Sequence, residues 1–296
     1  MIIAPAPRVR TILADVWKTL LILFVWDCVV TAFFYLLPYK APSLPLTIFG
    51  TALALFLGLR DNSAYQRWWE GRILWGAMIN SSRSLARALI AFIPDDRPDM
   101  VRFKQMMVLR QITYVNVLRR QLRRQDSHEE LSRLLPPEEI GDAGGKVNIA
   151  NALLTDAGRR IADAQRAGHI DTIQQTQLEA VLVDIANHQG GMERLKNTPL
   201  PNGYRFFPSL FTRLFCVLLP VGLYGDLNLA TPVGSTIAGL MFLAVLRIAD
   251  DLVDPFADSV HDVPITAICR TVEIDLKQTI GMDAPKPVLP DHGVLW

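Results

Sequence analysis

Four apolar stretches lie in two pairs, one pair toward each end of the 296-residue chain. They run from Trp17 to Leu37, Leu44 to Leu59, Leu210 to Tyr224 and Pro232 to Val245. A helix needs about 20 mainly apolar residues to cross a bilayer, so the first stretch suffices alone and the others need flanking residues. Because 50% of the residues are hydrophobic and only 20% are charged, a membrane protein is favoured over a disordered one. The pattern predicts two helical hairpins in a membrane.

Three ionisable residues interrupt or end these stretches: Asp27 in the first, Arg213 in the third and Arg247 after the fourth. A helix surrounded only by lipid rarely accepts such a group. We therefore expect these helices to pack on one another or on a second subunit. An isolated subunit is not expected to hide all three groups, which predicts an oligomer.

The basic residues predict the orientation of the chain. Residues 60–208 hold 21 of the 30 Lys and Arg, whereas the turns 38–43 and 225–231 hold only Lys40. Three more lie at or before the start of the first stretch: Arg8, Arg10 and Lys18. Because positively charged loops stay cytoplasmic, both termini and the central region are expected on the cytoplasmic side of a cell (inner) membrane. The first apolar run is too long for a signal peptide, so the N-terminus is expected to be retained.

Composition and motifs argue against several function classes. A formal net charge of +1 leaves no basic surplus for nucleic acid. The three cysteines, Cys28, Cys216 and Cys269, are far apart, which fits buried thiols better than disulfides. The chain has no HExxH or GxSxG, and the segment 141–146 (GDAGGK) lacks the first Gly and the Ser/Thr of a P-loop. We expect no catalytic residue and no cofactor.

The central region is predicted to be helical. Apolar residues recur at helical spacing, as at Ile173, Leu178, Leu182 and Ile185, and no alternating strand pattern is present. Breaks are expected at Pro94, Pro98, Pro136-Pro137 and Gly144-Gly145, and a stiff connection at Pro199 and Pro201.

A single long helix is expected from Leu44 to Ile93, with Ser43 as its N-cap. Within it Thr51, Leu55 and Leu59 lie four residues apart on one face. The small residues Gly50, Ala52, Ala54 and Gly58 allow close approach of another helix. The face is either an ordinary packing stripe or a ring of side chains that narrows a pore and closes it by dewetting. Spacing alone does not separate the two.

The residues after this face carry a signature. Residues 60–76 read RDNSAYQRWWEGRILWG, residues 190–194 read GGMER, residues 197–201 read NTPLP and residues 251–256 read DLVDPF. These motifs, in this order, resemble the bestrophin family, and most closely its bacterial branch. The resemblance spans roughly residues 10–282.

The resemblance implies an all-α membrane protein with four transmembrane helices per subunit, pentameric around a central pore. It implies one channel domain over residues 1–296. Its parts are membrane hairpins at about 17–60 and 208–248, a cytoplasmic helical region at about 61–207 and 249–282, and a tail at 283–296. The implied partners are further copies of the chain, membrane lipid and permeant ions.

The resemblance also implies pore residues. The family's apolar neck falls on Thr51, Leu55 and Leu59, although an aliphatic residue is usual at the first position and an aromatic one is common at the last. Its cytoplasmic aperture falls on Ile173, with Ile170 as the next candidate. The bacterial branch is associated with monovalent cations such as Na+ and K+. The alternatives are an anion (chloride) channel of the same fold, a membrane enzyme using Asp27 and Arg213, and a non-conducting scaffold.

Two sets of charged residues need a separate interpretation. The charges of the signature, from Arg60 to Arg72, are expected to form a structural network with their neighbours. The acidic set Asp250, Asp251, Asp254, Asp258 and Asp262, with His261, aligns with the calcium-binding stretch of vertebrate bestrophins. Because Ser259 stands where a second carboxylate is expected, we interpret the set as a solvated, helix-capping turn and predict no metal.

Overall fold

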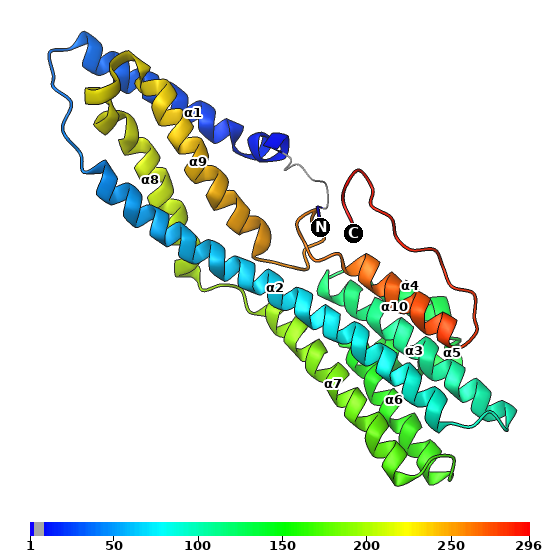
Figure 1. Cartoon of the computed structure of the whole chain (residues 1–296). Coiled ribbons are helices and arrows are strands. Elements are labelled where there is room, and N and C mark those ends of the chain that lie inside the picture. Colours follow the sequence, from blue (N-terminus) through cyan, green and yellow to red (C-terminus); the bar gives the residue numbers. More distant parts are fainter. Residues whose placement is uncertain (3–8) are drawn as a thin grey trace. The chain divides into compact units, whose positions relative to one another are not determined.

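The protein is described here by a computed structural model, which covers the backbone of residues 1–2 and 9–296 and the side chains of residues 1–2 and 14–296 (Figure 1). Two of the basic residues used above for orientation, Arg8 and Arg10, have side chains outside these described residues. In chain order the helices are α1 (Val9–Leu36), α2 (Leu46–Phe92), α3 (Pro98–Leu122), α4 (His128–Leu134), α5 (Pro137–Ile140), η1 (Gly141–Gly145), α6 (Ile149–Arg166), α7 (Thr172–Asn197), α8 (Asn202–Leu227), η2 (Asn228–Ala230), α9 (Thr231–Leu252) and α10 (Ile265–Thr279). The described residues contain isolated β-bridges but no strand, which confirms the all-helical prediction.

The prolines and glycines end the elements near the expected positions. Helix α2 ends at Phe92, before Pro94, and α3 begins at Pro98, whose missing N–H costs nothing in a first turn. Residues 198–201 connect α7 to α8. The chain divides into two compact units: an apolar unit, residues Ala4–Trp68 and Pro199–Val253, and a polar unit, residues Met1–Ile3, Trp69–Thr198 and Asp254–Trp296.

Helix α2 confirms the predicted long helix, but not its cap. Its 47 residues correspond to about 70 Å at 1.5 Å per residue. The helix begins at Leu46, and the carbonyl of Pro45 accepts hydrogen bonds from Ile48 N (3.0 Å) and Phe49 N (3.1 Å). Ser43 therefore lies too far before the helix to cap it, because the chain from Leu44 to Pro45 is not yet helical.

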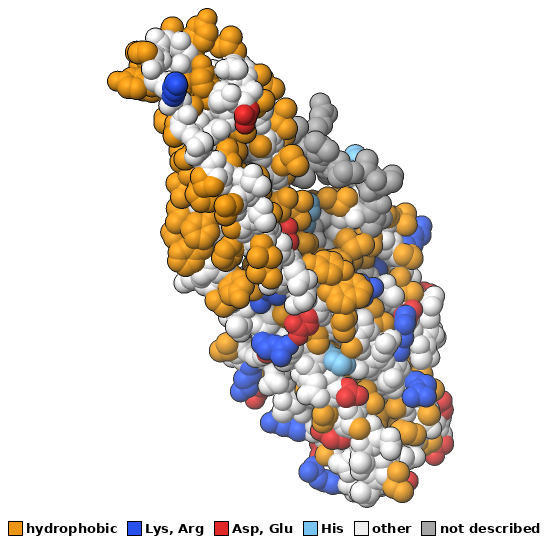
Figure 2. All heavy atoms as spheres, turned by 60° about the vertical axis from the view of Figure 1, so that its left-hand side comes forward, with side chains coloured by type: hydrophobic (Ala, Val, Ile, Leu, Met, Phe, Trp, Pro, Cys, Tyr) orange, Lys and Arg blue, Asp and Glu red, His pale blue; other side chains and the backbone are white. Residues whose placement is uncertain are grey.

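The apolar unit contains α1, α8, α9 and the first part of α2. Helix α9 packs on α1 and α8, and the start of α2 joins them through Leu53 and Leu57, which pack with Phe215, Leu219 and Leu246. Two described stretches are long and apolar enough to cross a membrane, Ala14–Leu36 and Asn202–Leu252, and the second contains both α8 and α9. Apolar side chains cover much of the face of this unit that is visible in Figure 2.

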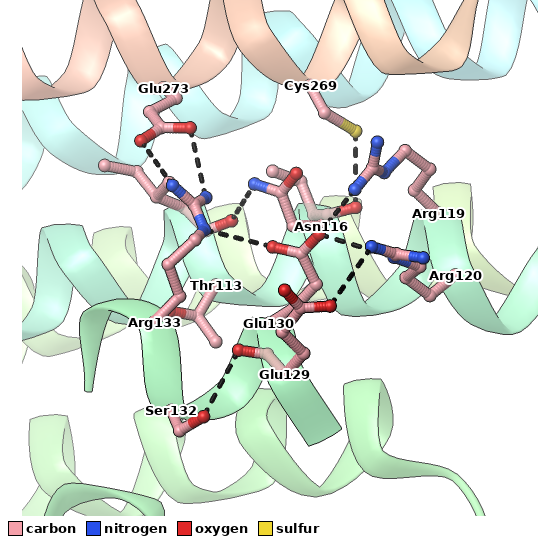
Figure 3. A network of polar contacts seen from close by, with 12 residues as sticks. Thr113, Asn116, Arg119, Arg120, Glu129, Glu130, Ser132, Arg133, Cys269 and Glu273 are labelled. Carbon is pink, nitrogen blue, oxygen red and sulfur yellow. Dashed lines mark hydrogen bonds and ion pairs between the residues drawn. The ribbon is translucent and has the colours of Figure 1, made fainter. Parts of the chain in front are cut away.

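The polar unit is built around α3. Its middle is almost fully buried, with Val108, Ile112 and Val115 at 0% exposure, and α10, α6 and α4 pack against it. Charged side chains are also buried here (Figure 3). Arg133 donates to both carboxylate oxygens of Glu273 (2.8 and 3.1 Å), while Arg119 pairs with Glu130 at 2.6 Å. Because the buried carboxylates of Glu130 and Glu273 both have arginine counter-ions, the network ties α3, α4 and α10 together.

The loop η1 is anchored by an exposed histidine. His128 Nδ1 lies 2.6 Å from an Asp126 carboxylate oxygen and Nε2 lies 3.2 Å from the carbonyl oxygen of Gly144. Both neighbours accept hydrogen bonds, so only the doubly protonated imidazolium satisfies both. The hydrogen bond that the ring donates to Asp126 is the main cause that raises the pKa of His128 above its ordinary 6.5, and the bond to the Gly144 carbonyl is the second.

We expect this anchor to loosen as the pH rises. The folded-state pKa of His128 is raised, so its contribution is complete below pH 6.5 and is lost as the pH passes through the higher folded-state value. Amide protection factors at residues 143–146 should therefore fall over that interval. A variant with His128→Gln should show low protection at every pH. If the protection factors of that variant fell with pH as they do in the unmodified protein, His128 would not be the group that anchors η1.

Candidate functional site: the exposed faces of α2 and α7

The predicted neck residues lie on an exposed face of α2. The side chain of Leu55 is 66% exposed and that of Leu59 is 53% exposed. Thr51 is also exposed, and its Oγ1 donates to the carbonyl of Thr47 at 2.7 Å, so its hydroxyl hydrogen is already used. No residue that the structure describes covers these three side chains, which are therefore open to contacts outside the subunit.

The two flanks of this face differ. At about 100° per residue, Phe49, Ala52 and Phe56 lie on one flank, and Ala54 and Gly58 lie on the other. On the first flank α2 and α8 form an apolar groove of about 270 Å³ whose walls include Phe211 and Leu214. On the second flank a Cβ at Gly58 would meet no atom within 4 Å, so packing within the subunit does not require glycine there.

Ile173 lies on an exposed face in the first turn of α7. Its side chain is 73% exposed, and a capping box of Asp171 and Gln174 fixes the helix start beside it. The same face continues through Gln177, Ala180 and Asp184, which are all exposed. The alternative candidate, Ile170, is only 5% exposed and belongs to the core, so it cannot line an opening in this fold.

A matched pair of substitutions on α7 tests the exposure of Ile173. Ile173→Ala should change the free energy of unfolding by less than about 0.5 kcal/mol, because the side chain buries little surface. Ile185→Ala, on the opposite face at 0% exposure, should cost about 2–5 kcal/mol. Thermal melting of both detergent-solubilised variants measures the difference. Similar losses in melting temperature would place Ile173 in a packed contact.

The ionisable groups of the apolar unit have three different environments. Asp27 is 1% exposed and accepts a hydrogen bond from Thr236 Oγ1 at 3.1 Å. Arg247 pairs with Asp15 at 3.1 Å and with Asp251 at 3.2 Å. One subunit therefore buries Asp27, with a hydroxyl of α9 as its hydrogen-bond donor, but it does not bury all three groups. The side chain of Arg213 is exposed on α8, and no described side chain pairs with it.

The charges of the 60–76 signature have structural partners. Arg60 is 2% exposed and forms an ion pair with Asp250, and Arg67 Nε donates to the carbonyl of Val253 at 3.0 Å. In the polar unit, Glu70 pairs with Arg194. These contacts agree with the structural interpretation of this segment.

Parts of the signature, and Lys196 between two of its motifs, come together within the polar unit, which the sequence did not reveal. Lys196 Nζ lies 2.7 Å from Asp254 Oδ2, and the other carboxylate oxygen accepts from the backbone N–H of Phe256. Phe256 is fully buried, and a Cβ at Gly71 would lie 3.1 Å from its ring. Gly71, Lys196, Asp254 and Phe256, which are far apart in the sequence, thus form one packing junction within the polar unit.

The acidic set is divided among separate partners. Asp258 pairs with Arg123 at 2.9 Å, and Asp262 accepts from Ser259 N (2.9 Å) and Ser259 Oγ (2.6 Å). Asp262 is 2% exposed, so the expectation of a solvated turn was wrong at this residue, because the chain folds back to bury it. Burial raises the pKa of Asp262, and the bonds from Ser259 oppose this. Among the described residues no three His, Cys, Asp or Glu side chains are grouped to hold a metal ion.

Comparisons with known proteins match almost the whole chain. Residues 8–278 match the family described as "Bacterial/Fungal Bestrophin protein". The chain is 33% identical over 287 residues to the "Voltage-dependent anion channel-forming protein YneE" of Salmonella typhi, covering 95% of this chain and 92% of that protein. It is 32% identical over 246 residues to a Mesorhizobium japonicum protein also described as voltage-dependent anion channel-forming, covering 83% of this chain and 77% of that protein.

A solved structure shares the fold. The crystal structure of a bacterial bestrophin homologue from Klebsiella pneumoniae superposes with a TM-score of 0.84 at 30% sequence identity, covering 90% of this chain and 99% of that chain. The names of the relatives refer to anions, whereas the resemblance seen in the sequence favoured cations. The sequence match and the shared fold agree with each other, and the chain belongs to the bacterial and fungal bestrophin family.

Proposed function

We propose that copies of this chain, five by resemblance, surround an axis in a cell membrane and pass small ions through it. The face of Thr51, Leu55 and Leu59 forms the apolar neck, and Ile173 forms a second, cytoplasmic constriction. The observation that carries the proposal is the exposure of Leu55 and Leu59 on a helix whose opposite face is buried. A ring of such side chains controls ion passage by excluding water.

The two flanks of α2 support a ring. If the neck face points to an axis, one flank faces the preceding copy and the other faces the following copy. The groove beside Phe56 of one copy then contacts the exposed backbone at Gly58 of the next copy. Such a head-to-tail contact, repeated by rotation about the axis, forms a closed ring. A glycine inside a helix costs about 1 kcal/mol relative to alanine, and close helix approach across the interface gives a reason for it.

The membrane arrangement follows from the same unit. We propose that α1, α8, α9 and the first part of α2 span the bilayer, with both termini and the polar unit in the cytoplasm. The exposed Arg213 supports a second subunit beside α8, because an unpaired arginine in lipid is costly. A detergent-solubilised particle with the mass of one 33.1 kDa chain would contradict the assembly.

We propose monovalent cations as the permeant ions. From Thr172 to Glu193, helix α7 carries Glu179, Asp184 and Glu193 and no Lys or Arg. Asp184 shares the exposed face of Ile173, so it would attract cations toward the opening. The neck itself carries no charge to oppose them.

Chloride is the second candidate, favoured by the names of the curated relatives. Purified protein in planar bilayers under a NaCl gradient separates the two candidates. A reversal potential toward the Na+ equilibrium value supports the cation proposal, and one toward the Cl− value supports the anion candidate. The absence of any flux, with the oligomer intact, would contradict the channel.

One substitution tests the charge argument. Asp184→Asn should move the reversal potential toward zero, because it removes a carboxylate from the proposed opening. Glu129→Gln makes the same charge change on α4, where the side chain is 84% exposed, and should leave the reversal potential unchanged. Equal shifts in both variants would show that only the overall charge of the protein matters.

A further inference from the structure

A polar cavity of about 610 Å³ lies in the polar unit, outside the faces described above. One wall is the loop η1 followed by Lys146, and the floor is the exposed face of α6. The lining includes Asp142, Asn151, Ala152 and Arg159. This glycine-rich segment is not a P-loop, but the fold places it opposite a row of polar side chains. The volume suits a small-molecule ligand.

Two cations of the cavity are free of counter-ions. Lys146 and Arg159 are exposed, and neither side chain has an ion pair or hydrogen bond with any described residue. The third cation, Arg160, is different because it pairs with Glu139 at 2.8 Å and Asp156 at 2.7 Å. Lys146 and Arg159 come from the wall and the floor respectively, so they approach a ligand from two elements.

The remaining polar groups determine where a ligand would bind. The start of α6 is already capped, since Asn148 Oδ1 accepts from Asn151 N at 3.0 Å and Gln121 Oε1 accepts from Ala150 N at 3.1 Å. The helix N-terminus is therefore not the anion site, and binding depends on side chains. The side-chain amide of Asn151 is exposed and uncommitted among the described contacts. Asp142 is the one lining carboxylate outside the Arg160 pairs, and it would oppose an anion.

We propose that this cavity binds a small molecule carrying two linked phosphate groups. Lys146 and Arg159 each neutralise part of its charge, Arg159 through the planar fork that matches phosphate oxygens, and Asn151 donates a hydrogen bond. Two cations on separate elements fit a diphosphate better than a single carboxylate. The small side chain of Ala152, which lines the cavity, leaves space for the ligand.

The test is calorimetric titration of the full-length, detergent-purified protein with pyrophosphate at constant ionic strength. Lys146→Gln and Arg159→Gln should each weaken binding about tenfold or more, as expected for loss of one charge-assisted hydrogen bond. Ala152→Leu should block the cavity without a change of charge. Asp142→Asn should tighten binding, because it removes a repulsive carboxylate.

Arg87→Gln is the matched control, since Arg87 is exposed on α2 and does not line the cavity. It should leave the affinity unchanged. Saturable binding that is weakened in Lys146→Gln, Arg159→Gln and Ala152→Leu but not in Arg87→Gln supports the proposal. No binding to the unmodified protein overturns it, and so does equal weakening in Arg87→Gln, which would show non-specific attraction. Binding is measured without ion flux, so failure of the channel proposal would not affect this result.

Discussion

Glu273→Ala is expected to lower the free energy of unfolding by about 1–3 kcal/mol, because it removes a buried carboxylate that bonds Arg133 and Lys277. Glu273 is 2% exposed and holds the guanidinium of Arg133 with two bonds, and Lys277 Nζ lies 3.1 Å from the same carboxylate. Thermal or chemical unfolding of the detergent-solubilised protein measures the loss.

Two control variants test whether the loss of stability comes from the missing counter-ion. Glu129→Ala removes a carboxylate from the edge of the same network, where it is 84% exposed, and should change stability by less than about 0.5 kcal/mol. The double variant Arg133→Met with Glu273→Leu should recover much of the loss, because it removes both charges and keeps the volume. A double variant as unstable as Glu273→Ala would contradict the counter-ion argument.

The network also predicts acid sensitivity. Burial alone would raise the pKa of Glu273, but the bonds and charges of Arg133 and Lys277 outweigh burial and lower it below its ordinary 4.5. This contribution is therefore complete above pH 4.5 and is lost as the pH falls through the lower folded-state value. The unmodified protein should lose stability more steeply than Glu273→Ala over that acidic interval.

Leu59→Ala and Leu55→Ala are expected to raise the ionic current strongly while leaving assembly intact. Each substitution removes an apolar side chain from every copy around the proposed axis, which widens the neck and lowers the barrier to water entry. Both side chains are more than half exposed in the subunit, at 53% and 66%, so little folding stability is lost. Single-channel recording measures conductance and open probability.

Ile22→Ala is the control for the neck. Ile22 is 70% exposed on α1, so the substitution removes a comparable apolar side chain away from the proposed axis. The current should remain that of the unmodified protein. Unchanged currents in both neck variants, with the oligomer intact, would show that this face of α2 makes ordinary packing or lipid contacts and does not line a pore.

The sequence by itself determined the helices and their faces. The spacing of Thr51, Leu55 and Leu59 placed them on one side of α2, and the prolines at 94, 98, 199 and 201 marked where helices end or begin. These features are local, because helical periodicity and the missing N–H of proline act within a few residues. The order of the signature motifs was also enough to recognise the family.

Tertiary structure alone decided which groups meet across long stretches of chain. Arg60 and Asp250 are 190 residues apart, and no periodicity in either segment identifies the other as its partner. Packing likewise buried Asp27 beside Thr236, exposed Ile173 while burying Ile170, and placed Lys146 and Arg159 in the lining of one cavity. A side chain's own helix sets the direction in which it points, but its burial and its partner depend on which other helix packs there.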